Sequence, residues 1–157
     1  MDFDGGGFLK RKLYAGYGAN VNKDGMAERC SDAEVYGTGF IEGYRLEFRK
    51  VATIEKSDDD KVPVVVWRIS DDDEAQLDKF EGVANGLYRK DVLNVTLNSG
   101  EIAEAMVYIL EKDLPKTPPV KVYLNKIKEG YQQFGLDLDY LCEALKWSRG
   151  GIASEEK

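Results

Sequence analysis

The segment from Tyr88 to Leu110 constrains the fold of this chain more than any other. Two runs rich in Val, Ile, Tyr and Thr, Tyr88–Asn98 and Glu101–Leu110, flank Asn98-Ser99-Gly100. Such side chains favour extended strands, and Asn and Gly tolerate the positive φ of a tight turn. The segment therefore predicts two antiparallel strands joined by a hairpin turn.

Other segments of the chain predict further strands and three helices. The strands are Lys12–Gly18, Ala33–Ile41, Tyr44–Thr53 and Val62–Ser70. The acidic run Ser57–Asp60 is expected to be a solvated loop between the last two strands. The helices are expected from the N-cap Ser70 to Glu81, from Val120 to Phe134 and from Leu138 to Trp147, with Gly82 and Gly135 as stop signals. Strands with helices between and after them predict an α+β domain with a small, largely antiparallel sheet or barrel.

Length and charge describe one ordinary globular domain over residues 1–157, with flexible tails expected at 1–8 and 149–157. The chain is 43% hydrophobic and 32% charged, and 29 acidic against 22 basic side chains give a net charge of -7. This balance argues against nucleic acid or an anionic membrane as the main partner, but not against a small anionic ligand. No secretory signal or membrane-length apolar run is visible, so a cytoplasmic location is expected.

The absence of histidine narrows the chemistry of the chain. It excludes Ser-His-Asp and Cys-His catalysis and any zinc or iron site built on histidine. Cys30 and Cys142 lie far apart without metal-ligand spacing, and we expect two reduced, buried thiols, although a disulfide is left open. Proton transfer near neutral pH therefore falls to a carboxylate, lysine, tyrosine or cysteine with a shifted pKa.

Glu81 is placed unusually for a glutamate. It lies four residues after Leu77, which together with Phe80 forms the apolar stripe of the expected helix. Its side chain is therefore expected on the buried face. Burial and the negative end of the helix dipole both raise the pKa of such a carboxyl, toward the range of a general base. The alternative is a structural glutamate that accepts backbone N–H bonds from the loop that follows.

The stretch Tyr17–Asn20 follows the first expected strand. Gly18 admits backbone conformations closed to other residues and Ala19 adds little bulk, so successive backbone N–H groups can face an anionic ligand. Asn20 is expected to lock the loop through a local bond from its side chain to the backbone. The alternative is an ordinary exit from a strand into a turn. The glycine pattern matches neither nucleotide-binding motif, so it gives no support to nucleotide binding.

Taken together, these segments resemble the γ-glutamylcyclotransferase family, with landmarks in the family's order from Leu13 to about Leu145. The first landmark is Tyr17–Asn20, which is similar to the family's Tyr-Gly-Ser-Asn loop, and the second is Met26–Cys30 with Gly39–Phe48. The third is Leu77–Val83 with Gly86–Lys90, which is similar to the family's Leu-Asp-x-x-Glu-Gly-Val and Gly-x-Tyr. The resemblance continues through Val107–Ile109, Val122–Leu124 and Gly135–Tyr140. Ala19 departs from the pattern, because the family usually has serine there.

The resemblance implies a fold, a reaction and a set of site residues. The fold is a compact, partly open β-barrel, mixed but largely antiparallel, flanked by helices. In the reaction, the α-amino group of a γ-glutamyl-amino acid attacks the γ-carbonyl and releases 5-oxoproline and a free amino acid, without a metal or cofactor. Glu81 is the implied catalytic acid and base. The implied substrate-binding residues are Tyr17, Gly18, Ala19, Asn20, Tyr88, Tyr108 and Tyr123.

Three matters stay open in the sequence. The substrate is either a γ-glutamyl-amino acid or a γ-glutamylamine, which includes ε-(γ-glutamyl)-lysine and a γ-glutamyl-protected amine of a biosynthetic pathway. The chain is either an enzyme or a binding module that keeps the fold without catalysis. The sequence also leaves open whether the chain forms a homodimer.

Overall fold

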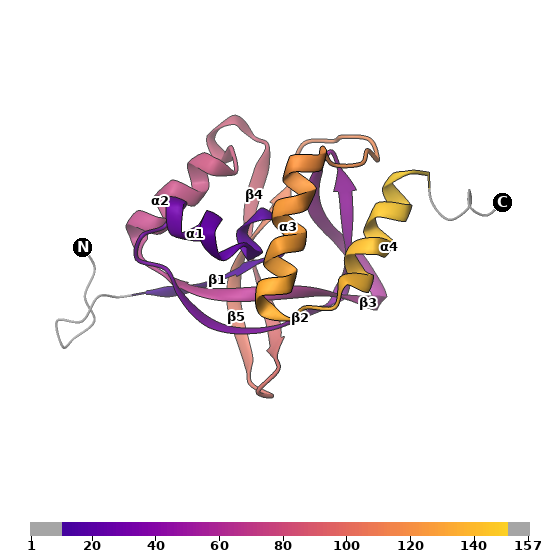
Figure 1. The fold of residues 1–157 in the computed structure, drawn as a ribbon. Helices are drawn as coiled ribbons and strands as arrows, with labels where there is room; N and C mark the ends of the chain where they lie inside the picture. Colours follow the sequence, from indigo (N-terminus) through magenta and orange to yellow (C-terminus); the bar gives the residue numbers. More distant parts are fainter. Residues whose placement is uncertain (1–10, 151–157) are drawn as a thin grey trace, which may run out of the picture.

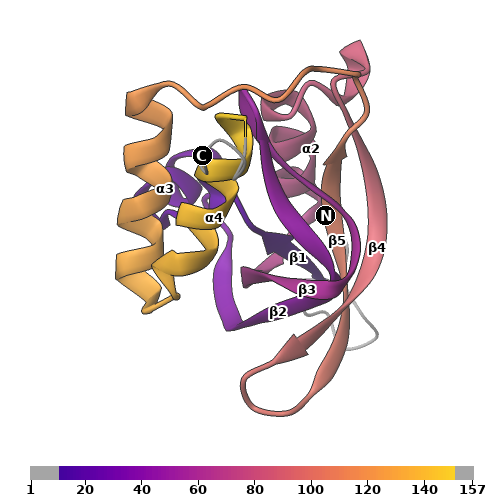
Figure 2. The same ribbon diagram turned by 90° about the vertical axis from the view of Figure 1, so that its right-hand side faces the viewer.

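The computed structural model describes residues 11–150, whose strands form a closed barrel with the order β1-β3-β2-β4-β5 (Figures 1 and 2). The strands are β1 Lys12–Gly16, β2 Glu34–Arg49, β3 Val51–Ile69, β4 Tyr88–Leu97 and β5 Ile102–Leu110. Neighbours pair antiparallel, except that β1 and β5 are parallel, with Tyr14 opposite Met106. The expected α+β architecture with a mixed, largely antiparallel barrel is confirmed, but the barrel is closed rather than partly open.

Helices pack around this barrel. They are α1 Lys23–Arg29, α2 Asp71–Phe80, α3 Lys121–Phe134 and α4 Leu138–Ser148, and two short 3-10 turns are η1 Ala19–Val21 and η2 Val83–Asn85. Helices α3 and α4 lie side by side in both views (Figures 1 and 2). The sequence predicts α2, α3 and α4 but not α1, because seven residues with an internal glycine give too short and too weak a helical pattern.

The ends of α2 are set by local signals that the sequence carries. Ser70 Oγ accepts a bond from the Asp73 N–H, and the Asp73 carboxylate accepts one from the Ser70 N–H, both at 3.1 Å. This capping box fixes the start of the helix. At the other end Glu81 is the C-cap and Gly82 follows with φ of 66°, the left-handed conformation that glycine favours. These two signals place Glu81 immediately after the last turn.

The three strands expected between residues 33 and 70 form one long hairpin, so their predicted boundaries are wrong. Strand β2 continues past Ile41 and ends at Arg49. Lys50 makes the turn with φ of 76°, and β3 begins at Val51. The predicted strand Tyr44–Thr53 is therefore split between β2 and β3. Lysine at a left-handed φ gives no turn signal in a sequence, because glycine and asparagine are the usual residues there.

The acidic run Ser57–Asp60 lies inside β3, so the solvated loop expected between two strands is wrong as an element. Glu42 pairs with Lys61 and Tyr44 with Lys56, which leaves residues 57–60 opposite Gly43. The acidic residues thus form an exposed bulge. Pairing on both sides of the bulge holds the chain in one strand, and the local composition does not show this.

Helix α3 is held against the segment that follows β1. A Cβ atom on Gly130 would lie 2.8 Å from the backbone nitrogen of Asn22, so glycine is needed for this close approach. The Asn22 side chain also donates to the Lys126 carbonyl at 2.9 Å and to Glu129 Oε1 at 3.0 Å. This contact brings Tyr123, on the same helix, toward the end of β1.

The remaining expectations concern the termini, the cysteines and membranes. The tails expected at 1–8 and beyond residue 150 lie outside the described residues, whereas Arg149 is the C-cap of α4. Cys30 and Cys142 are both free, but only Cys30 is buried, so the expectation of a buried thiol is wrong for Cys142. Between residues 11 and 150, no helix is long and apolar enough to span a bilayer.

Candidate functional site

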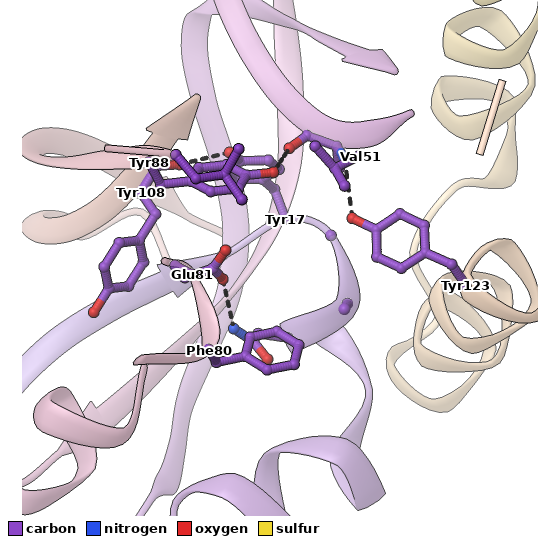
Figure 3. Close-up of a pocket in the computed structure, with 12 residues that line it drawn as sticks. Tyr17, Val51, Phe80, Glu81, Tyr88, Tyr108 and Tyr123 are labelled. Carbon is purple, nitrogen blue, oxygen red and sulfur yellow. Dashed lines mark hydrogen bonds between the residues drawn. The ribbon is translucent and has the colours of Figure 1, made fainter. Parts of the chain in front are cut away.

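A cavity of about 130 Å³ lies where the end of β1, the start of β3, the α2–β4 connection, β5 and α3 meet (Figure 3). All eight residues that the sequence analysis assigns to the site line this cavity. They are Tyr17, Gly18, Ala19, Asn20, Glu81, Tyr88, Tyr108 and Tyr123. Val51, Ala52, Phe80 and Leu87 complete the wall. The cavity therefore brings together side chains that are up to about a hundred residues apart in the sequence.

Glu81 projects toward this cavity from the end of α2 (Figure 3). Its N–H donates to the Leu77 carbonyl at 2.8 Å, and Leu77 is fully buried, as the sequence predicts. Phe80 is not part of a buried stripe, because 47% of it is exposed at the wall of the cavity. Burial raises the pKa of Glu81 from 4.5 to about 7, and the charge of Arg29 opposes that rise. Glu81 is therefore a carboxyl that exchanges a proton near neutral pH.

One oxygen of Glu81 has a partner inside the protein. Oε2 accepts a hydrogen bond from Asn20 Nδ2 at 3.2 Å, marked by the dashed line at Glu81 in Figure 3. Within residues 11–150, no backbone N–H bonds to the carboxylate. The alternative interpretation, a glutamate that accepts bonds from the following loop, is therefore wrong for this part of the chain.

The loop Tyr17–Asn20 carries backbone donors to the cavity wall. A Cβ atom on Gly18 would lie 3.0 Å from the Cβ of Ala52, so a side chain there would crowd β3. Ala19 begins η1, and the first N–H groups of a helical turn have no partner within it. No other described residue accepts a bond from the N–H of Gly18, Ala19 or Asn20. These groups are placed where an anionic ligand would need donors.

Within the described structure, the Asn20 side chain bonds to other side chains and not to the local backbone, so the prediction of a local side-chain-to-backbone bond is wrong. The residue is almost fully buried. Its Nδ2 donates to Tyr14 Oη at 2.8 Å as well as to Glu81. Its Oδ1 accepts from Nε and Nη2 of Arg29 at 2.9 and 2.5 Å, and its carbonyl accepts from Trp67 Nε1 at 2.9 Å. Sequence reasoning had no means of finding this network, because its members are brought together only by the fold.

Three of the four cavity tyrosines have hydroxyl groups that already donate to protein atoms. Tyr17 Oη donates to the Tyr108 carbonyl, and Tyr88 Oη donates to the Ala52 carbonyl. Tyr108 Oη donates to Asp78 Oδ1 at 2.7 Å, and its hydroxyl end points away from Glu81 (Figure 3). Burial raises the pKa of each of these phenols, so they stay neutral. They form a rigid, uncharged wall.

Tyr123 differs from the other three. Its Oη accepts a hydrogen bond from the Ala52 N–H at 3.0 Å (Figure 3). Burial raises the pKa of Tyr123 to about 12, so the hydroxyl keeps its hydrogen at neutral pH. No acceptor among residues 11–150 takes that hydrogen. Tyr123 is thus able to donate to a ligand in the cavity.

The cavity gathers groups that are suited to proton transfer. In the described part of the chain, no group of three or more histidine, cysteine, aspartate or glutamate side chains is placed to hold a metal ion. The cavity instead combines a carboxyl with a pKa of about 7, free backbone donors, one free phenol hydrogen and apolar walls. Such a site is able to bind an anionic group and to exchange a proton with a bound molecule.

Comparison with known proteins shows what this chain is similar to in sequence and fold. The AIG2-like family matches residues 61–144. The γ-glutamylcyclotransferases of Bos taurus and Homo sapiens are 28% and 26% identical over 140 residues, covering 82% of this chain and 74% of each relative. A solved γ-glutamyl cyclotransferase structure has a TM-score of 0.77 at 25% identity, covering 83% of this chain and 84% of that one. The solved structure of an uncharacterized Homo sapiens protein has a TM-score of 0.76 at 26% identity, and the match covers 83% of each chain.

Proposed function

The chain belongs to the AIG2-like family, and from that membership and the cavity around Glu81 we propose that it is a γ-glutamylcyclotransferase. In the proposed reaction, a γ-glutamyl-amino acid is converted into 5-oxoproline and a free amino acid. The observation that carries the proposal is Glu81, whose pKa of about 7 suits a general base in a chain without histidine. The names of the relatives support the same activity.

The proposed chemistry needs Glu81 twice. The ionised carboxylate first takes a proton from the substrate's α-ammonium group. The free amine then attacks the γ-carbonyl carbon, which forms the ring C–N bond and a tetrahedral oxyanion. Glu81 returns its proton to the departing nitrogen as the original amide C–N bond breaks. In a second cycle, Glu81 takes the remaining extra proton from the ring nitrogen and passes it to the released amine. Two protons leave one nitrogen and two reach the other, so charge and atoms balance.

The cavity supplies the other requirements of this cyclisation. The N–H groups of Gly18, Ala19 and Asn20 and the Tyr123 hydroxyl are the donors proposed for the substrate's anionic oxygens. Because Ala19 has no hydroxyl, anion binding at that position rests on the backbone alone. The neutral tyrosine wall holds the γ-glutamyl chain folded back, which brings the amine close to its own carbonyl.

The volume of the cavity suggests how much of the substrate it holds. About 130 Å³ is well below the roughly 300 Å³ or more of typical pockets for larger ligands. The γ-glutamyl group would occupy the cavity, and the leaving amine would project past Val51, Phe80 and Leu87 at its wall. The choice of leaving group would therefore be weaker than the recognition of the γ-glutamyl group.

A substrate panel tests the proposal. Purified protein is incubated with γ-glutamyl-amino acids, γ-glutamylamines and ε-(γ-glutamyl)-lysine, and 5-oxoproline is measured by chromatography. We expect 5-oxoproline from γ-glutamyl-amino acids. The matching α-glutamyl dipeptides serve as controls, because their cyclisation would lose water and leave a pyroglutamyl peptide rather than release free 5-oxoproline. Release from the amines alone would identify a γ-glutamylamine cyclotransferase. Binding of the panel without any 5-oxoproline would favour a non-catalytic binding module.

A further inference from the structure

The proposed function leaves unexplained what fixes the orientation of Glu81, and the neighbouring α1 helix offers an answer. Arg29, the last residue of α1, does not line the cavity. Its guanidinium nevertheless donates to Asn20 Oδ1 through two nitrogen atoms, and Asn20 Nδ2 donates to Glu81. A continuous chain of hydrogen bonds thus joins Arg29 to the carboxylate.

This chain of bonds determines which way the Asn20 amide faces. An arginine has only donors, so the amide oxygen must face Arg29 and the NH₂ group must face the other side. Both hydrogens of that NH₂ group are used, one by Tyr14 Oη and one by Glu81 Oε2. Each polar atom of the Asn20 side chain therefore has partners, and a flipped amide would place hydrogen against hydrogen.

Phe80 and Gly25 lie next to the Arg29 guanidinium and shape the space that it occupies. The Phe80 ring covers one side, with its centre 3.9 Å from Arg29 Cζ. On α1, a Cβ atom on Gly25 would lie 2.8 Å from Arg29 Nη2, so an alanine there would make the end of the Arg29 side chain shift. Glycine inside a helix costs stability relative to alanine. With glycine at this position, the guanidinium keeps the place in which it contacts Asn20.

We propose that Arg29 is a positioning residue that orients the Asn20 amide and thereby directs proton exchange to one oxygen of Glu81. Because Asn20 donates to Oε2, a proton on that oxygen would weaken the hydrogen bond that it accepts. Protons from the substrate are therefore taken and returned at Oε1, which accepts no hydrogen bond from residues 11–150. This inference rests on the proposed cyclotransferase reaction and adds to it a residue outside the cavity.

The charge of Arg29 adds a second, separable effect. The titratable and charged groups around Glu81 are Arg29 from α1, Tyr14 from β1, Tyr17 from the following loop, Tyr88 from β4 and Tyr123 from α3. The tyrosines are neutral at working pH, whereas Arg29 is a cation that favours the ionised carboxylate and lowers its pKa. Orientation and charge can therefore be removed separately by substitution.

Three variants separate these effects, with Arg68→Gln as the matched control. Arg68 also stacks on an aromatic ring, that of Tyr36, but does not line the cavity. Arg29→Gln removes orientation and charge, Arg29→Lys keeps the charge without the two-nitrogen contact, and Gly25→Ala keeps Arg29 but displaces its guanidinium. The readouts are kcat and KM for 5-oxoproline release against pH, the Glu81 pKa from carboxyl ¹³C NMR, and thermal stability.

The expected results are specific to each variant. All three substitutions at Arg29 and Gly25 should lower kcat by up to about a hundredfold with smaller changes in KM. Arg29→Gln should also move the Glu81 pKa and the acidic limb of the profile to higher pH, whereas Arg29→Lys should leave them in place. Gly25→Ala should remain folded, because alanine is the better helix former and offsets part of the loss of the two Arg29–Asn20 bonds. Arg68→Gln should match the wild type.

The inference is overturned if Gly25→Ala and Arg29→Gln keep the wild-type kcat, or if Arg29→Lys restores it fully. Failure of the proposed function is a different result, in which the wild type itself releases no 5-oxoproline. In that case the NMR measurement still decides the effect of the Arg29 charge on the Glu81 pKa, since it needs no turnover. An unchanged Glu81 pKa in Arg29→Gln would overturn the proposed charge effect of Arg29.

Discussion

Replacing Glu81 by glutamine should make the protein more stable at alkaline pH. Burial raises the pKa of this carboxyl from 4.5 to about 7 in the folded state. Between these two pH values the folded protein keeps a proton that the unfolded chain has released, so stability falls as pH rises through this window. Each pH unit corresponds to about 1.4 kcal/mol, and the ionised carboxyl therefore costs the fold at most about 3 kcal/mol above pH 7.

Glutamine has nearly the same shape and no charge. Its side-chain oxygen still accepts the bond from Asn20 Nδ2 that Glu81 Oε2 accepts in the wild type. The stability difference between Glu81→Gln and the wild type should thus rise from near zero at pH 4.5 to as much as about 3 kcal/mol at pH 8. A stability gain on replacing a residue is typical of active sites, where the native residue is kept for its reactivity at a cost in folding stability.

Urea denaturation followed by circular dichroism at pH 5, 6, 7 and 8 measures this difference. Glu28→Gln, at an exposed position on α1, controls for the loss of one negative charge from the chain. The reasoning is refuted if Glu81→Gln is no more stable than the wild type at pH 8, or if its advantage does not change with pH.

Three further substitutions have defined outcomes. Tyr131→Phe should raise the free energy of unfolding by about 1 kcal/mol in urea denaturation, because the Tyr131 hydroxyl is buried without a hydrogen-bond partner in the described structure; a loss of stability would contradict this. Leu77→Ala should cost about 2–5 kcal/mol, since Leu77 is fully buried beneath Glu81, and a loss below about 1 kcal/mol would show that the site collapses without strain. Tyr123→Phe should raise KM for a γ-glutamyl substrate about fivefold with less effect on kcat, and an unchanged KM would exclude its hydroxyl as a substrate donor.

The elements that the sequence predicts well are those with local signals at their ends. Ser70 and Gly82 delimit α2, Gly135 stops α3, and Asn98-Ser99-Gly100 joins β4 to β5. The hairpin of β2 and β3 lacks such local signals, and its boundaries are therefore predicted poorly from the sequence. Its turn uses Lys50, and its long ladder continues across an acidic bulge, so local composition contradicts the pairing.

In the candidate site too, some residues are predictable from the sequence and others are found only through the fold. Glu81 stands out in the sequence because it shares a helix face with Leu77, and the resemblance to a family adds the loop and the tyrosines. The partners of Asn20 are separate in the sequence and meet only through the closure of the barrel and the position of α1. The structure also distinguishes Tyr123, with a free phenol hydrogen, from Tyr108, which bonds Asp78, and no sequence pattern separates these two tyrosines.

The central claim, that Glu81 is the acid and base of a cyclotransferase, is tested most directly by one comparison. Release of 5-oxoproline from the same γ-glutamyl-amino acid is measured for the wild type and for Glu81→Gln, with substrate binding followed by calorimetry. We predict similar binding and at least about a hundredfold slower release in the variant. Equal release by the two proteins would contradict the account.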